Sequence, residues 1–442
     1  MTATLSLLRD GKLTGSKRLD LGCGLTDFPE EIFTLADSLE VLNLSGNALS
    51  TLPDDLSRLY KLRVIFCSDN QFVELPEVLG RCPRLEMIGF KANRISHVPP
   101  AALPPGLRWL ILTDNQIAEL PAELGACVVL QKCMLAGNRL RQLPQQMANC
   151  KSLELLRISA NRFEQLPDWL WTLPRLAWLA FAGNPCSDGF EAAPGASQVV
   201  AKVDWGQLEL KHCLGEGASG VIHHAQYRQQ SGDTAVAVKV FKGDVTSDGL
   251  PRSEMAACIK AGAHPGLIPF VGVVTGHPLE AQALVMALIN PEFVNLSAPP
   301  SLESCTRDCY EENIRFSAVG VMQIALKISA VAAHLHAQGL MHGDLYAHNI
   351  LWDQHDDCLL GDFGAATMLS PHDEAVGLRM QRIEVRAFAC LLEELLDRLI
   401  EPQQATQVVD ALRAMQRRSA DPDVNMRPLF EQLQSELKSL QG

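Results

Sequence analysis

The chain has 442 residues, of which 47% are hydrophobic and 20% charged, the balance of a globular protein with more than one domain. Its net charge of −13 is uneven, because residues 1–195 hold 19 basic and 21 acidic side chains whereas residues 196–442 hold 19 and 30. Neither half is basic, so nucleic acid and anionic membranes are poor candidates for partners.

The sequence gives no sign of export or membrane insertion. Residues 1–17 lack a continuous apolar core, so we expect no secretory signal. We also expect no membrane span, because no apolar stretch approaches the roughly 18 residues that a span requires. The 13 cysteines show no framework spacing, which favours free thiols and a cytoplasmic location.

A repeat of about 23 residues fills the first half of the chain. Leucines precede a recurring asparagine at fixed offsets, as Leu39, Leu42 and Leu44 do before Asn47. This pattern resembles the leucine-rich repeat, which implies a solenoid whose units bury their leucines against one another. The asparagine is predicted to bond the backbone where each strand turns away. The recurring residues are Asn47, Asn70, Asn93, Asn115, Asn138, Asn161 and Asn184.

The strands of these repeats are predicted to present apolar side chains on the concave face. Strand side chains alternate, so the residues that flank the buried leucines point to that face. Contiguous apolar surface is typical of a site for a protein substrate or regulator. Two alternatives are that the chain's own second half covers this surface, or that the side chains only pad the strands. The predicted surface comprises Phe66, Trp109, Ile111, Met134 and Trp178.

The regular spacing of leucines stops after Asn184, where glycine, proline, alanine and serine become frequent. Such composition is typical of a linker. The sequence therefore predicts a leucine-rich-repeat domain over 1–186, a linker over 187–205 and a second domain over 206–442.

The second domain opens with a glycine-rich turn, Gly-Glu-Gly-Ala-Ser-Gly-Val-Ile, at 215–222. Taken alone, this turn also fits a dinucleotide site, which would need a helix next. Here a second strand is predicted at 221–227, and a third at 236–240 contains Lys239. A phosphate loop of the Gly-Lys-Ser/Thr type is excluded, because no such sequence follows the glycines.

Further motifs follow in order. Glu254 lies 15 residues after Lys239, Asp344 precedes Asn349 by five residues, and Asp362 begins an Asp-Phe-Gly sequence. From about 206 to 440 this order resembles a protein kinase domain. The two resemblances together imply the fold class: an α/β leucine-rich-repeat solenoid followed by an α+β bilobal protein-kinase-like domain.

The kinase resemblance implies ATP and Mg²⁺ as ligands and a role for each motif. Asp344 would orient the acceptor hydroxyl and take its proton, while Lys239, paired with Glu254, would bind the α and β phosphates. Asn349 and Asp362 would hold Mg²⁺. The predicted nucleotide-binding residues are Gly215, Glu216, Gly217, Ala218, Ser219, Gly220, Ile222, Ala237, Lys239 and Met286.

The sequence departs from the kinase pattern in three places. Gly343 replaces the arginine that normally reads a phosphate on the activation loop, so we expect activity without loop phosphorylation. Tyr346 stands where serine/threonine kinases usually place a lysine. No Ala-Pro-Glu follows Gly364, which leaves Arg427 without the partner that the family pattern gives it.

Three functions fit these residues. The first is a protein kinase, serine/threonine by default, whose repeats recruit a substrate or regulator. The second is a small-molecule phosphotransferase of the kinase-like fold, which the His-Gly-Asp sequence also resembles. The third is a pseudokinase scaffold that only binds nucleotide, against which the retained Lys239, Glu254, Asp344, Asn349 and Asp362 argue.

Overall fold

The computed structural model describes residues 3–187, 201–217, 219–230, 232–243, 245–246, 248–355, 357–369, 374–400 and 406–441. The chain divides into two compact units, Met1–Leu173 and Pro174–Gly442. The sequence predicts the end of the repeats at residue 186, whereas the last repeat clusters with the second unit. Each unit is described by itself.

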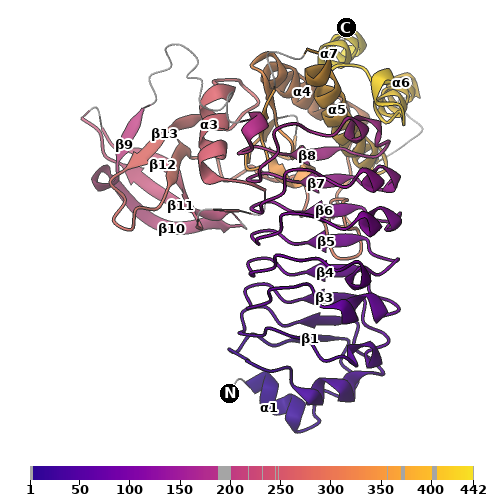
Figure 1. The fold of residues 1–442 in the computed structure, drawn as a ribbon. Helices are drawn as coiled ribbons and strands as arrows, with labels where there is room; N and C mark the ends of the chain where they lie inside the picture. The colour runs from indigo at the N-terminus through magenta and orange to yellow at the C-terminus, as the bar shows by residue number, and fades with distance from the viewer. Residues whose placement is uncertain are drawn as a thin grey trace. The chain divides into compact units, whose positions relative to one another are not determined.

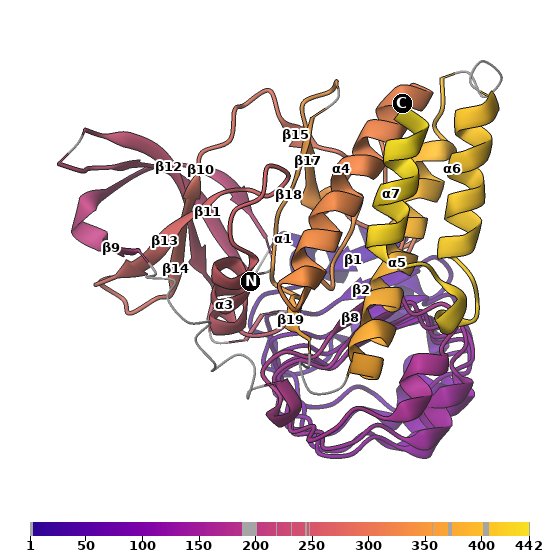
Figure 2. The ribbon, with the colours of Figure 1, turned by 90° about the horizontal axis from the view of Figure 1, so that it is seen from above.

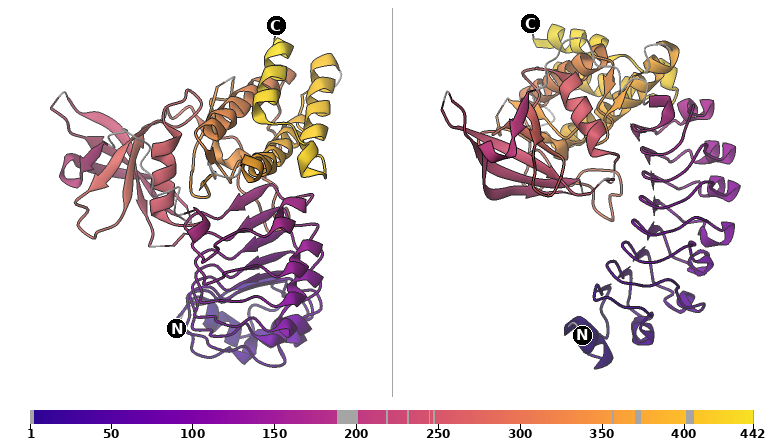
Figure 3. Two further views of the ribbon diagram at one scale, coloured as in Figure 1. Left: turned by 45° about the horizontal axis from the view of Figure 1, so that its top comes forward. Right: turned by 60° about the vertical axis from the view of Figure 1, so that its left-hand side comes forward.

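The first unit is a ladder of short parallel strands (Figure 1). After helix α1 (Ala3–Arg9), each repeat contributes one strand and most add a short 3₁₀ helix, and the views in Figure 3 show the strands on one side and the helices on the other. The strands are β1 (Arg18–Asp20), β2 (Val41–Asn43), β3 (Val64–Phe66), β4 (Met87–Gly89), β5 (Trp109–Ile111), β6 (Lys132–Met134) and β7 (Leu155–Arg157). The 3₁₀ helices are η1 (Glu30–Leu35), η2 (Leu56–Arg58), η3 (Glu77–Arg81), η4 (Pro100–Ala102), η5 (Ala122–Ala126), η6 (Gln145–Asn149) and η7 (Asp168–Thr172).

The recurring asparagines bond the backbone as predicted. Asn70 Oδ1 accepts from the amide of Leu49 at 2.9 Å, and Nδ2 donates to the carbonyl of Leu44 at 2.9 Å. The residue before it, Asp69, has φ of 53°, the left-handed conformation that ends the strand. These bonds join neighbouring repeats, and the leucines between them are fully buried, so stacking stabilises the array.

The second unit begins with the last repeat strand and continues into a two-lobed fold. The first lobe is a six-stranded sheet in the order β10-β11-β12-β14-β13-β9, with one helix, α3. β9 lies in the predicted linker, but its Val203 is buried in the core of this sheet and so forms an edge strand. The elements are β8 (Trp178–Ala180), β9 (Lys202–Asp204), η8 (Trp205–Gln207), β10 (Leu208–Glu216), β11 (Gly220–Tyr227), β12 (Thr234–Phe241), α3 (Pro251–Ala261), β13 (Phe270–Thr275) and β14 (Ala283–Ala287).

The second lobe is mainly helical, and its long helices lie side by side (Figure 2). Short strand pairs beside helix α4 carry the motif residues described below. The elements are β15 (Val294–Asn295), α4 (Ala318–Ala337), β16 (Leu340–Met341), η9 (Ala347–Asn349), β17 (Ile350–Trp352), β18 (Cys358–Leu360), β19 (Thr367–Met368), α5 (Glu374–Leu396), α6 (Thr406–Ser419), η10 (Val424–Met426) and α7 (Phe430–Gln441).

Helix α4 corrects one expectation from the sequence. By length and composition it could cross a membrane, so the expectation that no apolar stretch approaches that length is wrong. Half of its apolar window is buried, and Val321, Ile324 and Ile328 are fully enclosed. The helix packs against α5 and α7, which accounts for its composition as that of a core helix.

Candidate active site

The glycine-rich turn joins β10 to β11 through tight backbone contacts. Gly217 N donates to Gly220 O at 2.9 Å, which closes the turn. A side chain at Gly220 would lie 2.5 Å from the carbonyl oxygen of Val240, so only glycine fits between the strands. Gly215 and Gly217 have open space around them, which lets a phosphate approach the backbone amides. Ala218, also a predicted nucleotide ligand, lies outside the described residues.

Lys239 joins the two lobes of the site through two carboxylates. It lies on β12, opposite Ile222 of β11 and Leu284 of β14. Its Nζ lies 2.5 Å from Glu254 Oε1 and 3.4 Å from Asp362 Oδ1. Lys239 and Glu254 are buried, whereas the Asp362 side chain is 46% exposed. The lysine is therefore held rigidly while one carboxylate still faces an open site.

The charges of these three residues depend on one another. Burial acts to lower the pKa of Lys239, but Asp362 and Glu254 outweigh it, so the pKa lies above its ordinary value. Burial raises the pKa of Glu254 to about 7, against the opposing effect of Lys239. Desolvation acts to raise the pKa of Asp362, but Lys239 and the Gly364 amide keep it below its ordinary value. Near neutral pH, the lysine and Asp362 are charged and Glu254 titrates.

The pH dependence of ATP use is expected to show this titration. We expect kcat/KM for ATP to rise as pH increases through about 7, because the ionised Glu254 pairs with Lys239. The contribution of Glu254 to folding stability changes in the opposite direction. Above pH 4.5 the folded chain keeps a proton on this carboxyl that the unfolded chain has lost. Raising the pH to about 7 therefore lowers the stability of the folded chain. The measurement is a pH profile of wild type beside Glu254→Gln. If the rise of kcat/KM near pH 7 is unchanged in Glu254→Gln, a group other than Glu254 is responsible for it.

A hairpin places the remaining motif residues. β17 pairs with β18 so that Ile350 lies opposite Leu360, which puts Asn349 and Asp362 at the same end. Asn349 Nδ2 donates to Asp344 Oδ2 at 2.8 Å and to the Asp344 carbonyl at 2.9 Å. The Asp344 carboxylate is thus held by an amide and kept half-buried, ready to orient a hydroxyl.

Asn349 and Asp362 fit Mg²⁺ in the way that phosphate-transfer sites do. Both offer oxygen atoms from one end of the same hairpin, and Mg²⁺ is commonly held by one or two protein oxygens together with waters and phosphates. Within the described part of the chain, no three His, Cys, Asp or Glu side chains gather as a metal cluster. The oxygen atoms of Asn349 and Asp362 suit an ion shared with ATP, which would neutralise phosphate charge.

Five of the predicted residues line one cavity of about 90 Å³ between the lobes. They are Ile222, Lys239, Glu254, Met286 and Asp362. Ala237, on β12 directly opposite Met286 of β14, continues the strand surface next to it. The cavity is not lined by Gly215, Gly217, Gly220, Asp344 or Asn349.

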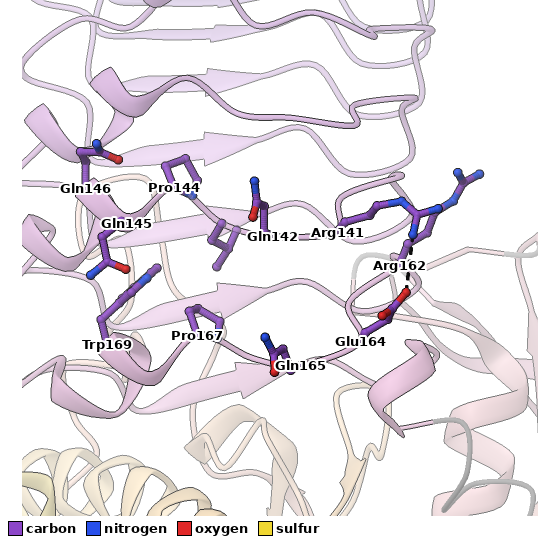
Figure 4. A pocket seen from close by; sticks show the side chains of 11 residues that line it. Arg141, Gln142, Pro144, Gln145, Gln146, Arg162, Glu164, Gln165, Pro167 and Trp169 are labelled. Atoms are coloured by element: carbon purple, nitrogen blue, oxygen red, sulfur yellow. Dashed lines mark ion pairs between the residues drawn. The ribbon is translucent and has the colours of Figure 1, made fainter.

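A separate hollow in the first unit carries no such chemistry. It has a volume of about 990 Å³ and is lined by residues between 141 and 169, mostly glutamines and prolines (Figure 4). Arg141 and Glu164 form an ion pair across it at 3.6 Å. Because none of the predicted site residues lines it, we place the active site at Lys239, Asp344 and Asp362.

Comparison with known families agrees with this geometry. Residues 208–396 match the family described as protein tyrosine and serine/threonine kinase, and residues 38–59 match the leucine-rich repeat. Residues 208–396 form a protein kinase domain. The fold class predicted from the sequence, repeats followed by a bilobal kinase domain, is confirmed.

Similar proteins come from both branches of protein kinases. "Probable serine/threonine-protein kinase gdt4" of Dictyostelium discoideum is 31% identical over 158 residues, tyrosine-protein kinase ABL2 of Mus musculus 28% over 165, and cyclin-dependent kinase 10 of Homo sapiens 27% over 182. These matches cover 35%, 37% and 40% of this chain. They cover only 8%, 12% and 46% of the relatives' own lengths.

Two buried carboxylates that the sequence did not single out support the loop that carries Asp344, residues 342–349, which we call the catalytic loop. Glu384 of α5 accepts from the Gly343 amide at 2.7 Å and lies 2.7 Å from His336 Nε2. Asp308 accepts from the His348 amide at 3.0 Å and lies 2.7 Å from its Nδ1. An acidic residue inside an apolar helical run, as at Glu384, is the signal that could have identified the first.

One residue of the predicted partner surface is covered by the chain's own second half, one of the two alternatives that the sequence left open. Trp178 is 1% exposed and stacks on Tyr346 of the kinase domain, so it does not lie on an open face and cannot contact a partner there. Phe66, Trp109 and Ile111 are half-buried on the strands of the first unit, and Met134 is buried. The Lys132 ammonium lies 4.2 Å from the Trp109 ring centroid, which adds a charge to this surface.

The kinase domain is expected to keep most of its activity without hydroxyls after the Asp-Phe-Gly sequence. Thr367 is 1% exposed and bonded to backbone, which hides it from a kinase, and Ser370 lies outside the described residues. In the double variant Thr367→Ala, Ser370→Ala, we expect a rate within about threefold of wild type, since Thr367 loses only two long, neutral hydrogen bonds, one from the Phe181 amide and one to the Ala365 carbonyl. Initial rates at saturating ATP give the comparison. Complete loss of activity would contradict the expectation drawn from Gly343.

Proposed function

We propose that this chain is an ATP-dependent protein kinase. The observation that carries the proposal is the pair of contacts of Lys239, which reaches Glu254 and Asp362 at the same time. The lysine–glutamate pair is one of the arrangements that an active kinase needs, and the second contact brings Asp362 to the same site. A pseudokinase scaffold has no need for this arrangement together with Asp344 held by Asn349.

The residues divide the work of transfer among them. Lys239 supplies positive charge to the α and β phosphates, and the glycine turn supplies backbone amides. Asp344, oriented by Asn349, accepts the proton of the attacking hydroxyl. The hydroxyl oxygen bonds to the γ phosphorus while the bond between the γ phosphorus and the leaving ADP oxygen breaks. Mg²⁺ bound at Asn349 and Asp362 would neutralise the charge that develops on the phosphates.

We propose serine or threonine as the acceptor. Among the relatives named above, the one at 31% identity is described as a probable serine/threonine kinase, which supports this class. A tyrosine kinase follows at 28%, so tyrosine must be tested beside it. Tyr346 stands in place of the lysine typical of serine/threonine kinases, so the acceptor panel includes tyrosine peptides.

We propose that the repeats recruit a protein substrate or regulator through Phe66, Trp109, Ile111 and the neighbouring Met134. Phe66 on β3 and Trp109 and Ile111 on β5 are half-buried, and the buried Met134 lies on β6, which pairs with β5. Aromatic and aliphatic side chains of this kind support a binding role. A cytoplasmic location is also proposed, supported by 13 cysteines that show no framework spacing along the chain. Replacing Trp109 with Ser should weaken partner capture while ATP turnover without the partner stays the same.

An acceptor panel tests the proposed function. The full chain is incubated with Mg²⁺-ATP and, in parallel, with serine/threonine peptides, tyrosine peptides, a mixed protein substrate and small amino alcohols. Asp344→Asn serves as the control in each reaction. Transfer to peptides containing serine or threonine is expected. Transfer to the small alcohols alone would favour a small-molecule phosphotransferase, and no transfer above the control would favour a scaffold.

A further inference from the structure

The last repeat strand, β8, packs directly on the catalytic loop of the kinase domain. The Trp178 ring stacks on Tyr346, with ring centroids 4.1 Å apart and planes 6° from parallel. Its Nε1 donates to the carbonyl of Leu345 at 3.1 Å. Both rings are buried, and Leu345 directly follows Asp344. The tryptophan therefore touches the backbone and side chain next to the residue that orients the acceptor.

The residue that directly follows β8 also contacts the segment after the Asp-Phe-Gly sequence. Phe181 N donates to Thr367 Oγ1 at 3.3 Å. Thr367 lies on β19, which pairs with β16 through Met341, the residue just before the catalytic loop. Figure 2 shows β8 beside α5 and β19. The repeat strand thus contacts both sides of the loop that carries Asp344.

Gly343 shows how closely the repeat approaches. Its φ is 74°, and a side chain built there would lie 2.9 Å from the carbonyl oxygen of Leu179 on β8 and 2.5 Å from that of Ala365. No larger residue fits between these carbonyls. The backbone of the last repeat therefore fills the place where a side chain at this position would project.

Arg427 fixes the start of the same repeat. It is 1% exposed and donates to three backbone carbonyls, those of Asp421 at 2.8 Å, Arg382 at 3.2 Å and Pro174 at 2.8 Å. Burial and the neighbouring Arg386 lower the pKa of Arg427 to about 10. The kinase pattern pairs this arginine with a glutamate after the Asp-Phe-Gly sequence. Here Arg427 instead binds the carbonyl of Pro174, the residue that opens the last repeat.

We propose that Trp178 is a positioning residue for Asp344, and that the last repeat holds the catalytic loop in its active form in place of a phosphorylated loop. The inference rests on the proposed kinase function. The contacts of Trp178 lie on the buried side of the loop, whereas Asp344 stays half-buried and bonded to Asn349. β8 therefore supports the loop without covering the carboxylate, which distinguishes this role from inhibition.

Removal of the tryptophan ring is expected to slow transfer without weakening nucleotide binding. In the full chain, Trp178→Ala should lower kcat by about 10²-fold, the effect of misplacing a reacting group by about 1 Å, with KM for ATP within about threefold. Trp178→Phe keeps a ring against Tyr346 and should recover most of the rate. Trp169→Ala removes another buried tryptophan, from η7, and serves as the matched control with a small change in kcat.

Hydrogen exchange of residues 340–351 gives a second readout that needs no turnover. Trp178→Ala should speed exchange there and Trp169→Ala should not. Tyr346→Ala removes the stack from the other side and replaces Trp178→Ala if that variant fails to fold. Unchanged loop exchange, a kcat that stays the same or rises, or equal effects of the control would overturn the inference. If wild type transfers no phosphate, the proposed function fails, while loop exchange still decides whether Trp178 positions the loop.

Discussion

Replacing Asp344 with asparagine is expected to lower kcat about 10³-fold while the Kd for ATP stays within about threefold of wild type. Asparagine has the same shape, and Asn349 can still donate to the backbone carbonyl at 344. What is lost is the carboxylate that accepts the proton of the attacking hydroxyl, a contribution of about 10² to 10⁴ in rate. Steady-state kinetics and a binding isotherm with an ATP analogue measure the two quantities separately.

The control for this variant is Asp353→Asn, in the turn between β17 and β18. Asp353 accepts from the amides of His355 and Asp357, which an asparagine oxygen can also do. Its kcat should therefore match wild type. An Asp344→Asn enzyme that transfers phosphate at a rate close to wild type would remove Asp344 from the proposed role. A loss of ATP binding in that variant would point to nucleotide binding instead.

Glu384→Ala is expected to cause the largest loss of stability, about 3–5 kcal/mol in the free energy of unfolding. The carboxylate is buried and holds both the Gly343 amide and His336. Burial acts to raise the pKa of Glu384, but His336 and the Gly343 amide outweigh it and keep the pKa below its ordinary value of 4.5. Its contribution to stability is therefore present above pH 4.5 and lost as pH falls below it.

Denaturant unfolding of wild type and Glu384→Ala at several pH values measures this effect. Glu393→Ala, on the same helix, is the control: Glu393 is 46% exposed and pairs with Arg307, so its loss should cost about 1 kcal/mol or less. The gap between the two variants should narrow as pH falls, because Glu384 of wild type becomes protonated. Equal losses in both variants would show that Glu384 has no special structural role.

Periodic and ordered patterns in the sequence predicted the fold. A period of about 23 residues predicts the repeat ladder because each unit buries the same leucines and bonds the same asparagine. The kinase domain is predicted by the order of its motifs, because these motifs follow one another in the same order in every chain with this fold. The motifs are the glycine turn, Lys239, Glu254, Asp344 and Asp362. Both signals lie in the order and spacing of residues along the chain, which is why one sequence was sufficient for them.

Contacts between distant segments could not be predicted in the same way. The stack of Trp178 on Tyr346 joins residues 168 positions apart, and no periodicity links them. Trp178 matches the strand pattern of the other repeats, so it was assigned with Trp109 to an open surface. What differs is the neighbour that covers it, and a repeat pattern contains no information about neighbours beyond the array.

In the candidate site, too, the residues that belong to motifs could be predicted and the residues that support them could not. The structure brings Lys239, Glu254 and Asp362 together, as the order of the motifs suggested. The supporting carboxylates Glu384 and Asp308 lie 41 and 40 residues from the loop positions they bind, on elements with no motif of their own. Buried polar groups of this kind become visible only when the chain is folded and their partners are known.

The measurement that tests the central claim most directly is the initial rate of the full chain after treatment with a phosphatase. Mg²⁺-ATP and a serine/threonine peptide are added once the phosphatase has been removed, and peptide phosphorylation is followed from the first turnover. If the last repeat holds the catalytic loop in place, transfer starts at its full rate without a lag. A lag that ends with phosphorylation of the chain itself, or no transfer above Asp344→Asn, would contradict the account.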